Sequence, residues 1–199
     1  MEEIAPGVST WRQYAERLGY DLNGFAWAVE GDVVAVDPPE PTADAAAWFE
    51  RNPPTLIVVT NHTHWRSTAA VRALSGARVA LSAIDAAAVP GLVDRVLRPG
   101  EILPGGWRVL DMAGKTAGEL GLYRAGAPGT LLLGDSLIGD PPGALRLLPS
   151  AKLDDRDRLL VSLQQLRDLS YEVLLLGDGA PLLAGADGLV RTFLDLLAD

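Results

Sequence analysis

Side chains that could do chemistry gather in three short segments that each follow an apolar stretch, and in a fourth, glycine-rich turn. The segments are 61–66, 134–135, 177–179 and 114–118. Loops at strand ends present side chains from a rigid base, and glycine lets the backbone approach a ligand closely. We therefore expect the four segments to form one ligand site.

The residue types in these segments suit metal binding or acid–base chemistry. The first segment holds the only two histidines, His62 and His64, and the others contribute Lys115, Asp135 and Asp178. Imidazoles and carboxylates bind metal ions and transfer protons. Lys115, Asp135 and Asp178 are accordingly our candidate catalytic residues. The chain has no cysteine and no Gly-x-Ser-x-Gly segment, which excludes thiolate sites and disfavours a serine nucleophile.

A run of strands, followed by alternating strands and helices, must position these residues. Stretches that are apolar on both faces predict buried central strands, and apolar residues at helical spacing predict amphipathic helices. This order indicates sheets packed on one another with helices outside, in one domain over 1–199. We expect strands at 25–29, 33–36, 55–60, 79–81, 107–111, 120–124, 130–133 and 173–176, and helices at 41–51, 67–74, 85–96, 154–169 and 185–197.

Composition narrows the possible partners and location. The chain has 199 residues, of which 48% are apolar, so it can bury a sizeable core. Its formal net charge of -9 disfavours nucleic acid or an anionic membrane surface as the main partner. No apolar run reaches the roughly 18 residues needed to span a bilayer, and the first residues lack a signal-peptide pattern. We therefore expect a cytoplasmic protein.

The four segments resemble the metal-binding motifs of metallo-β-lactamase-fold hydrolases. That family has Thr-His-x-His-x-Asp-His after a buried strand, then Gly-His-Thr-x-Gly, Gly-Asp and Gly-His-Gly. This chain has Thr-Asn-His-Thr-His-Trp-Arg at 60–66, Gly-Lys-Thr-Ala-Gly at 114–118, Gly-Asp at 134–135 and Gly-Asp-Gly at 177–179. The N-terminal hairpin also ends in Val-Asp-Pro, as in the family. The resemblance covers about 24–197 and implies an α+β fold, a four-layer αββα sandwich, with metal-dependent hydrolysis of esters, thioesters, amides or phosphoesters.

The resemblance also shows that most metal-ligand positions are altered. Matched position by position, ligand positions hold Asn61, Thr63, Trp65, Arg66 and Lys115; Asp135 is kept, and Asp178 replaces the last histidine. Tryptophan, arginine and charged lysine do not coordinate Zn²⁺, so a two-metal centre is excluded. Our first interpretation is a degenerate, metal-free site without a cofactor. In it, Arg66 and Lys115 form salt bridges with Asp135 and Asp178, since buried charges must be paired.

The alternative interpretation restores one metal ion through the shifted histidines. On an extended segment, the i, i+2 spacing points His62 and His64 to the same side. A one-residue bulge after Thr60 would move them into the first two histidine positions. With Asp135 and Asp178 they would hold one Zn, Mn or Fe ion, in an active mononuclear hydrolase of an ester, thioester or similar substrate.

The remaining residues of the altered motifs are candidate substrate-binding residues for a small-molecule ligand: Asn61, Thr63, Trp65, Arg66 and Thr116. Several have a structural alternative, because Trp65 could fill the core, Thr116 could cap its turn and Asn61 could bond to its own loop. A homodimer is a further possibility, through exposed apolar residues near Trp107 or at 145–148.

Overall fold

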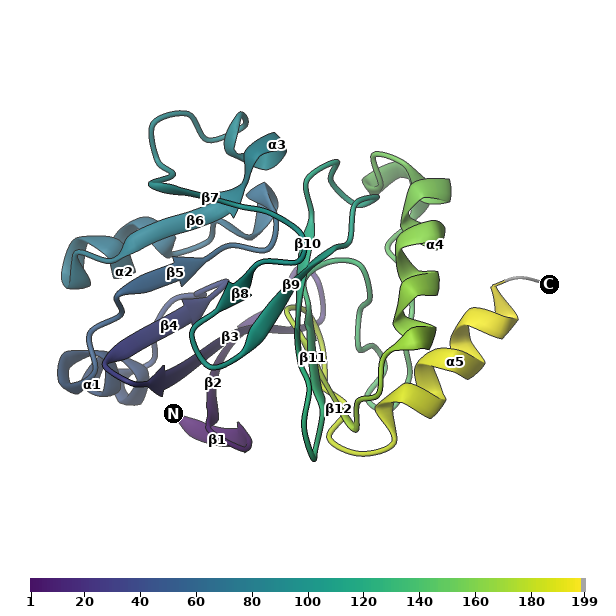
Figure 1. The fold of residues 1–199 in the computed structure, drawn as a ribbon, viewed down its shortest axis with the longest axis horizontal. Coiled ribbons are helices and arrows are strands. Elements are labelled where there is room, and N and C mark those ends of the chain that lie inside the picture. The colour runs from purple at the N-terminus through teal and green to yellow at the C-terminus, as the bar shows by residue number, and fades with distance from the viewer. Residues whose placement is uncertain (198–199) are drawn as a thin grey trace.

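The computed structural model describes residues 1–197 and contains two β-sheets that face each other, with helices on both outer sides (Figure 1). The first sheet runs in the order β1 (Glu2–Ala5), β2 (Val8–Ala15), β3 (Tyr20–Val29), β4 (Asp32–Val36), β5 (Leu56–Val58), β6 (Arg78–Ser82), β7 (Arg95–Leu97). The second runs in the order β12 (Val173–Leu176), β11 (Thr130–Leu133), β10 (Leu120–Arg124), β9 (Trp107–Asp111), β8 (Ile102–Leu103). The helices are α1 (Ala43–Arg51), α2 (Thr68–Ser75), α3 (Ala83–Ala86), α4 (Arg156–Gln164) and α5 (Ala186–Leu196), with 3₁₀ turns η1 (His62–His64), η2 (Ser150–Lys152) and η3 (Gln165–Asp168).

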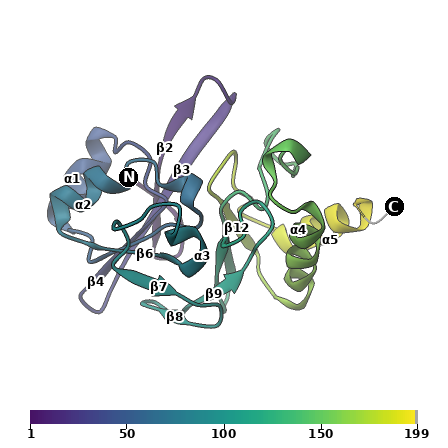
Figure 2. The ribbon, with the colours of Figure 1, turned by 90° about the horizontal axis from the view of Figure 1, so that it is seen from above.

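Three apolar clusters hold four layers together, which confirms the expected αββα sandwich. Phe25 and Trp107 belong to the cluster between the two sheets. Phe49 of α1 packs in a second cluster on the outer side of the first sheet. Val190 of α5 packs with Leu163 of α4 in a third, on the outer side of the second sheet. Figure 2 shows α1 and α2 on one side of the sheets and α4 and α5 on the other.

Strand pairing brings the polar segments to one edge of the molecule. β11 and β12 are parallel, with Leu133 opposite Leu176, so Asp135 and Asp178 lie at equivalent positions after neighbouring strands. β4, β5 and β6 are also parallel in the first sheet. A hydrogen bond of 2.8 Å from the Leu120 N–H to the Thr60 carbonyl joins the ends of the two sheets. Because parallel strands end at the same edge, their following loops meet.

Several expected elements are shorter than the sequence pattern indicates. The expected helix at 85–96 is a single turn, α3, after which turns lead to β7. The expected helix at 154–169 begins with Asp155 as its N-cap and ends as the 3₁₀ turn η3. Ser67 occupies the N-cap position of α2, yet its hydroxyl donates to Glu40 instead of capping the helix.

The two places named for a dimer surface are partly exposed: Ile102 on β8, next to Trp107, is exposed and Leu147 is half-buried. Trp107 is fully buried, and Leu145 and Leu148 are also buried in the described chain. Trp107 stacks on Trp27 inside the sandwich, because both rings project from strands toward the opposing sheet. A homodimer remains a prediction. Among the helices at 1–197, none combines the length and apolar composition needed to cross a membrane.

Candidate active site

The loop after β5 forms a 3₁₀ turn, which corrects the expected direction of the two histidines. Asn61 is the N-cap of η1, and its Oδ1 accepts from the backbone N–H groups of Thr63 at 2.9 Å and His64 at 3.2 Å. In a 3₁₀ turn of about 3.0 residues, the side chains at i and i+2 point roughly 120° apart around the axis, whereas in a strand they point the same way. His62 therefore turns to Asp85, with its Nδ1 3.3 Å from Oδ2, and only His64 enters the site. The structure does not bring the two rings together.

His64 is the centre of a buried group of three carboxylates. Its Nδ1 lies 2.8 Å from Asp37 Oδ2. Its Nε2 lies 3.3 Å from Asp135 Oδ1 and 3.8 Å from Asp178 Oδ1. All four side chains are buried, so their charges interact strongly.

Asp37 is a site residue that our search for motif positions missed. It follows β4 and accepts from the Thr60 N–H at 2.7 Å and the Thr60 hydroxyl at 2.6 Å. Its backbone has φ 45°, a left-handed conformation that is strained for a non-glycine residue and that these bonds hold in place. The one signal in the sequence was that Asp37 is a polar residue directly after the second strand of the hairpin and before Pro38.

Arg66 fills the space beside His64 and Asp178. Its Nη2 lies 2.5 Å from Asp178 Oδ1 and 3.2 Å from His64 Nε2. The guanidinium also donates to the carbonyls of Asn23 at 2.9 Å, Asp37 at 3.1 Å and Gly177 at 3.2 Å. These acceptors lie within β3, after β4 and after β12, so Arg66 joins the two halves of the site.

Lys115 carries the corresponding charge on the Asp135 side. Its Nζ lies 3.2 Å from Asp135 Oδ2 and donates to the Thr63 hydroxyl at 3.0 Å. The turn that presents it is fixed from behind, because Asp85 accepts from the Thr116 hydroxyl at 2.7 Å and the Gly118 N–H at 3.0 Å. Gly118 itself is required, since a Cβ there would lie 2.2 Å from Ser82 Oγ.

Mutual charge shifts the pKa values of this group. Burial and Arg66 lower the pKa of His64, but Asp135 and Asp37 outweigh them and raise it to about 10. Burial raises the pKa of Asp135, yet the His64 and Lys115 charges bring it well below its usual range. Burial raises the pKa of Asp178 despite the His64 and Arg66 charges. Three basic side chains, His64, Arg66 and Lys115, thus face three carboxyl groups, Asp37, Asp135 and Asp178.

Glu119 adds a neutral acid behind Asp135. It is fully buried, and its Oε1 accepts from the Ser136 N–H and hydroxyl, both at 2.8 Å. Burial and the Asp135 charge raise the pKa of Glu119 to about 8, so it is protonated at neutral pH. Its Oε2 is buried without a hydrogen-bond partner among the residues described.

A pocket of about 310 Å³ opens onto the charged group. Its walls contain the expected residues Thr63, Arg66, Lys115, Asp135 and Asp178, together with His64. Leu18, Tyr20, Leu22, Leu148 and Lys152 complete the lining, and no motif indicated them.

The other candidate ligand-binding residues have structural roles in this arrangement. Asn61 is buried as a cap, and its Nδ2 lies 3.4 Å from Asp135 Oδ2. Trp65 packs against the apolar cluster beneath α1 and α2. Thr116 is bonded to Asp85. These three side chains do not line the pocket.

The donor set was tested for a metal ion by its geometry. One ligand atom each from His64, Asp135 and Asp178 lies within 4.8 Å of the others, a spacing that one ion could bridge. However, Arg66 Nη2 lies within 3.2 Å of His64 Nε2 and 2.5 Å of Asp178 Oδ1. A shared metal ion would have to lie about 2.0–2.2 Å from each of these two donors. The guanidinium occupies the side on which they would share it.

Comparison with known proteins identifies the family. A family model described as the metallo-beta-lactamase superfamily matches residues 3–195. The hydroxyacylglutathione hydrolase of Cereibacter sphaeroides is 37% identical over 124 residues, which cover 59% of this chain and 48% of that protein. This match spans about half of the relative's length.

Solved structures share the whole architecture. A metallo-beta-lactamase from Pontibacter korlensis has a TM-score of 0.77 at 18% identity, covering 100% of this chain and 98% of the other. A metallo-beta-lactamase family protein from Thermus thermophilus has a TM-score of 0.73 at 20% identity, covering 98% and 81%. A protein solved in a di-iron-bound form has a TM-score of 0.61 at 25% identity, covering 80% and 88%. Because the family model matches residues 3–195, the chain belongs to the metallo-β-lactamase superfamily, as a divergent relative of its hydrolases.

Proposed function

We propose that the pocket binds a small molecule without a resident metal ion and does not hydrolyse it by metal-bound hydroxide. The observation that carries this proposal is the position of the two cationic side chains. Arg66 bonds to Asp178 and Lys115 to Asp135, at the carboxylates that would otherwise hold a metal.

Charge balance supports this proposal. A buried carboxylate without a partner is costly, so loss of metal ions must be compensated. Three basic side chains, His64, Arg66 and Lys115, match the three acidic ones, Asp37, Asp135 and Asp178, in number. A divalent ion in the same place would lie close to the Arg66 guanidinium and would have to displace the proton of His64.

The charged group is also poorly suited to activating water by itself. The pKa of Asp135 is too low for it to accept a proton readily near neutral pH. Lys115 is engaged by Asp135, with its Nζ 3.2 Å from Oδ2. The pocket can instead recognise a ligand, with Leu18, Leu22 and Leu148 for an apolar part and the Lys115 side for a polar part.

Metal analysis of the intact protein, purified without chelator, tests the proposal. We expect far less than one equivalent of zinc, manganese or iron per chain. We also expect no hydrolysis of hydroxyacylglutathione or of simple esters and thioesters, with or without added Zn²⁺ or Mn²⁺. One equivalent of bound metal together with metal-dependent hydrolysis would overturn it.

A second candidate is a mononuclear metal site on His64, Asp135 and Asp178. It is favoured by the spacing of their ligand atoms and by the Asp37 carboxylate on Nδ1, a common orienting contact for metal-bound histidine. The relative solved with two irons points the same way. This candidate requires the Arg66 side chain to move. Zinc titration distinguishes it: His64→Asn would abolish binding, whereas His62→Asn, the matched control, would not.

A further inference from the structure

The sequence contains only two lysines, Lys115 and Lys152, and both line the charged pocket. Backbone hydrogen bonds hold them on neighbouring loops. The N–H of Asp154, two residues after Lys152, donates to the Lys115 carbonyl at 3.2 Å, and the Asp155 N–H donates to the Gly114 carbonyl at 2.9 Å. The 3₁₀ turn η2, which ends at Lys152, is therefore fixed beside the turn that carries Lys115. In a chain with a net charge of -9, two lysines at one pocket favour a negatively charged ligand there.

The other basic side chains of the pocket already have acidic partners. The ion pairs join Arg66 to Asp178, Lys115 to Asp135 and His64 to Asp37. Lys152 differs, because it forms no ion pair among residues 1–197. The pocket thus presents one basic group more than its carboxylates match, which favours a ligand that carries one negative charge.

Lys115 adds a buried donor to the wall of the pocket. Its Nζ contacts the Thr63 hydroxyl at 3.0 Å and Asp135 Oδ2 at 3.2 Å. A lysine ammonium group has three N–H donors, so one remains for a ligand oxygen. Lys152 is exposed and lies at the rim. A group with two oxygens could therefore bond to Lys115 with one and to Lys152 with the other.

The rest of the wall suits an apolar ligand body. Leu18 and Leu22 come from the hairpin of β2 and β3, and Leu148 precedes η2. Leu18 leaves 41% of its surface exposed, and a ligand that covered it would gain from burial of apolar surface. The volume of about 310 Å³ lies at the lower end of the range for small-molecule sites, about 300–1,000 Å³, so the ligand must be small.

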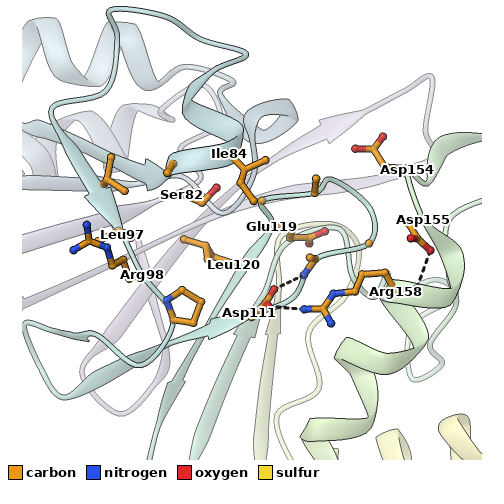
Figure 3. A pocket seen from close by; sticks show the side chains of 17 residues that line it. Ser82, Ile84, Leu97, Arg98, Asp111, Glu119, Leu120, Asp154, Asp155 and Arg158 are labelled. Carbon is orange, nitrogen blue, oxygen red and sulfur yellow. Dashed lines mark hydrogen bonds and ion pairs between the residues drawn. The ribbon is translucent and has the colours of Figure 1, made fainter.

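A larger cavity on the other side of the Lys115 turn has the opposite charge character (Figure 3). Its charged lining residues are Asp111, Glu119, Asp154, Asp155, Arg98 and Arg158. Arg158 bonds to Asp111 at 2.6 Å, so one of its two basic groups is already engaged. Asp154 and Asp155, the acidic neighbours of Lys152 in sequence, line this cavity and not the charged pocket. We therefore expect an anion in the charged pocket and not in this cavity.

We propose that the charged pocket binds a small organic carboxylate with one negative charge, its oxygens on Lys115 and Lys152 and its apolar body against Leu18, Leu22 and Leu148. The inference rests on the proposed function, because it requires Lys115 to face the pocket where a metal ion would otherwise lie. A phosphate monoester fits less well, since its second charge would lie close to the carboxylates of the pocket.

Titration of the full chain with phenylacetate, followed by backbone amide NMR shifts, tests the proposal. We expect saturable shifts at 18–22 and 148–152, and none at 82–84 or 96–98, which line the other cavity. Phenylacetamide has the same shape without the charge and should bind at least tenfold more weakly. Phenyl phosphate should also bind more weakly than phenylacetate. Equal binding of phenylacetamide, tighter binding of phenyl phosphate, or shifts confined to 82–84 and 96–98 would overturn the proposal.

Variants of exposed basic residues supply a matched comparison. Lys152→Gln should weaken phenylacetate binding about fivefold, as expected for loss of one partly exposed ion pair, whereas Lys152→Arg should keep the affinity within about twofold. Arg156→Gln removes the same charge from an exposed residue four positions along the chain that does not line the pocket, and it should leave binding unchanged. Equal effects of Lys152→Gln and Arg156→Gln would assign binding to overall charge and contradict the site.

Repeating the titration after passage of the protein over a metal-chelating resin separates this inference from the proposed function. Phenylacetate binding that survives the treatment supports both. If the protein holds no metal and phenylacetate does not bind, the ligand assignment fails while the metal-free pocket stands. If binding is lost on the resin and restored by Zn²⁺, the metal-free pocket itself fails, and the ligand assignment fails with it.

Discussion

Replacing Arg66 by methionine is the most direct test of the charged network. The substitution keeps an unbranched apolar stem and removes the guanidinium. It leaves the Asp178 carboxylate without its 2.5 Å partner, and three backbone carbonyls lose a charged donor. Removing one partner of a buried ion pair lowers the free energy of unfolding by about 3–5 kcal/mol. For a domain of this size, a loss of about 4 kcal/mol lowers Tm by roughly 8–16 °C.

Urea unfolding followed by far-UV circular dichroism measures the change in the free energy of unfolding. Arg72→Met is the matched control, because Arg72 pairs with Asp94 at 2.9 Å with both side chains about one third exposed. That variant should lose under about 1 kcal/mol. If Arg66→Met loses no more than Arg72→Met, the guanidinium is not compensating a buried carboxylate and the metal-free interpretation fails.

Two further predictions concern pH and glycine. The pKa of His64 is raised to about 10, so its stabilising contribution is complete below its unfolded value near 6.5 and is lost as pH rises through 10. Thermal unfolding should therefore show Tm falling between pH 7 and 10. His64→Asn should flatten the dependence of Tm on pH in this range. If the variant keeps the slope of the unchanged protein, a charged His64 imidazole does not stabilise the fold. Gly118→Ala should destabilise the fold by about 1–3 kcal/mol, because the added methyl would meet Ser82 Oγ at 2.2 Å. Gly188 lies in α5 with open space around it, so Gly188→Ala should instead stabilise the fold by about 0.5–1 kcal/mol. Equal changes in the free energy of unfolding for the two variants, measured by chemical denaturation, would refute the steric argument.

Local patterns in the sequence were enough to predict most of the framework. The stretches that became β5, β11 and β12 are apolar on both faces, which is what burial between layers requires. Thr42, a residue type that favours helix N-caps, accepts from the Ala45 N–H at the start of α1. Helix lengths were less predictable: Pro90 and the turns around it end α3 early, although the sequence near Asp85 suits a longer helix.

The sequence by itself also determined the charges available to the site, because Arg66, Lys115, Asp135 and Asp178 follow predictable strand ends. Only the tertiary structure decided how they combine. Asn61 caps a 3₁₀ turn that separates His62 from His64, and this bond depends on a loop conformation that residue spacing does not specify. Asp37 joins the group through pairing of β4 with β5, and the Arg66 guanidinium bonds to acceptors as distant in sequence as Asp178. Side-chain direction depends on such long-range contacts, which a local pattern does not encode.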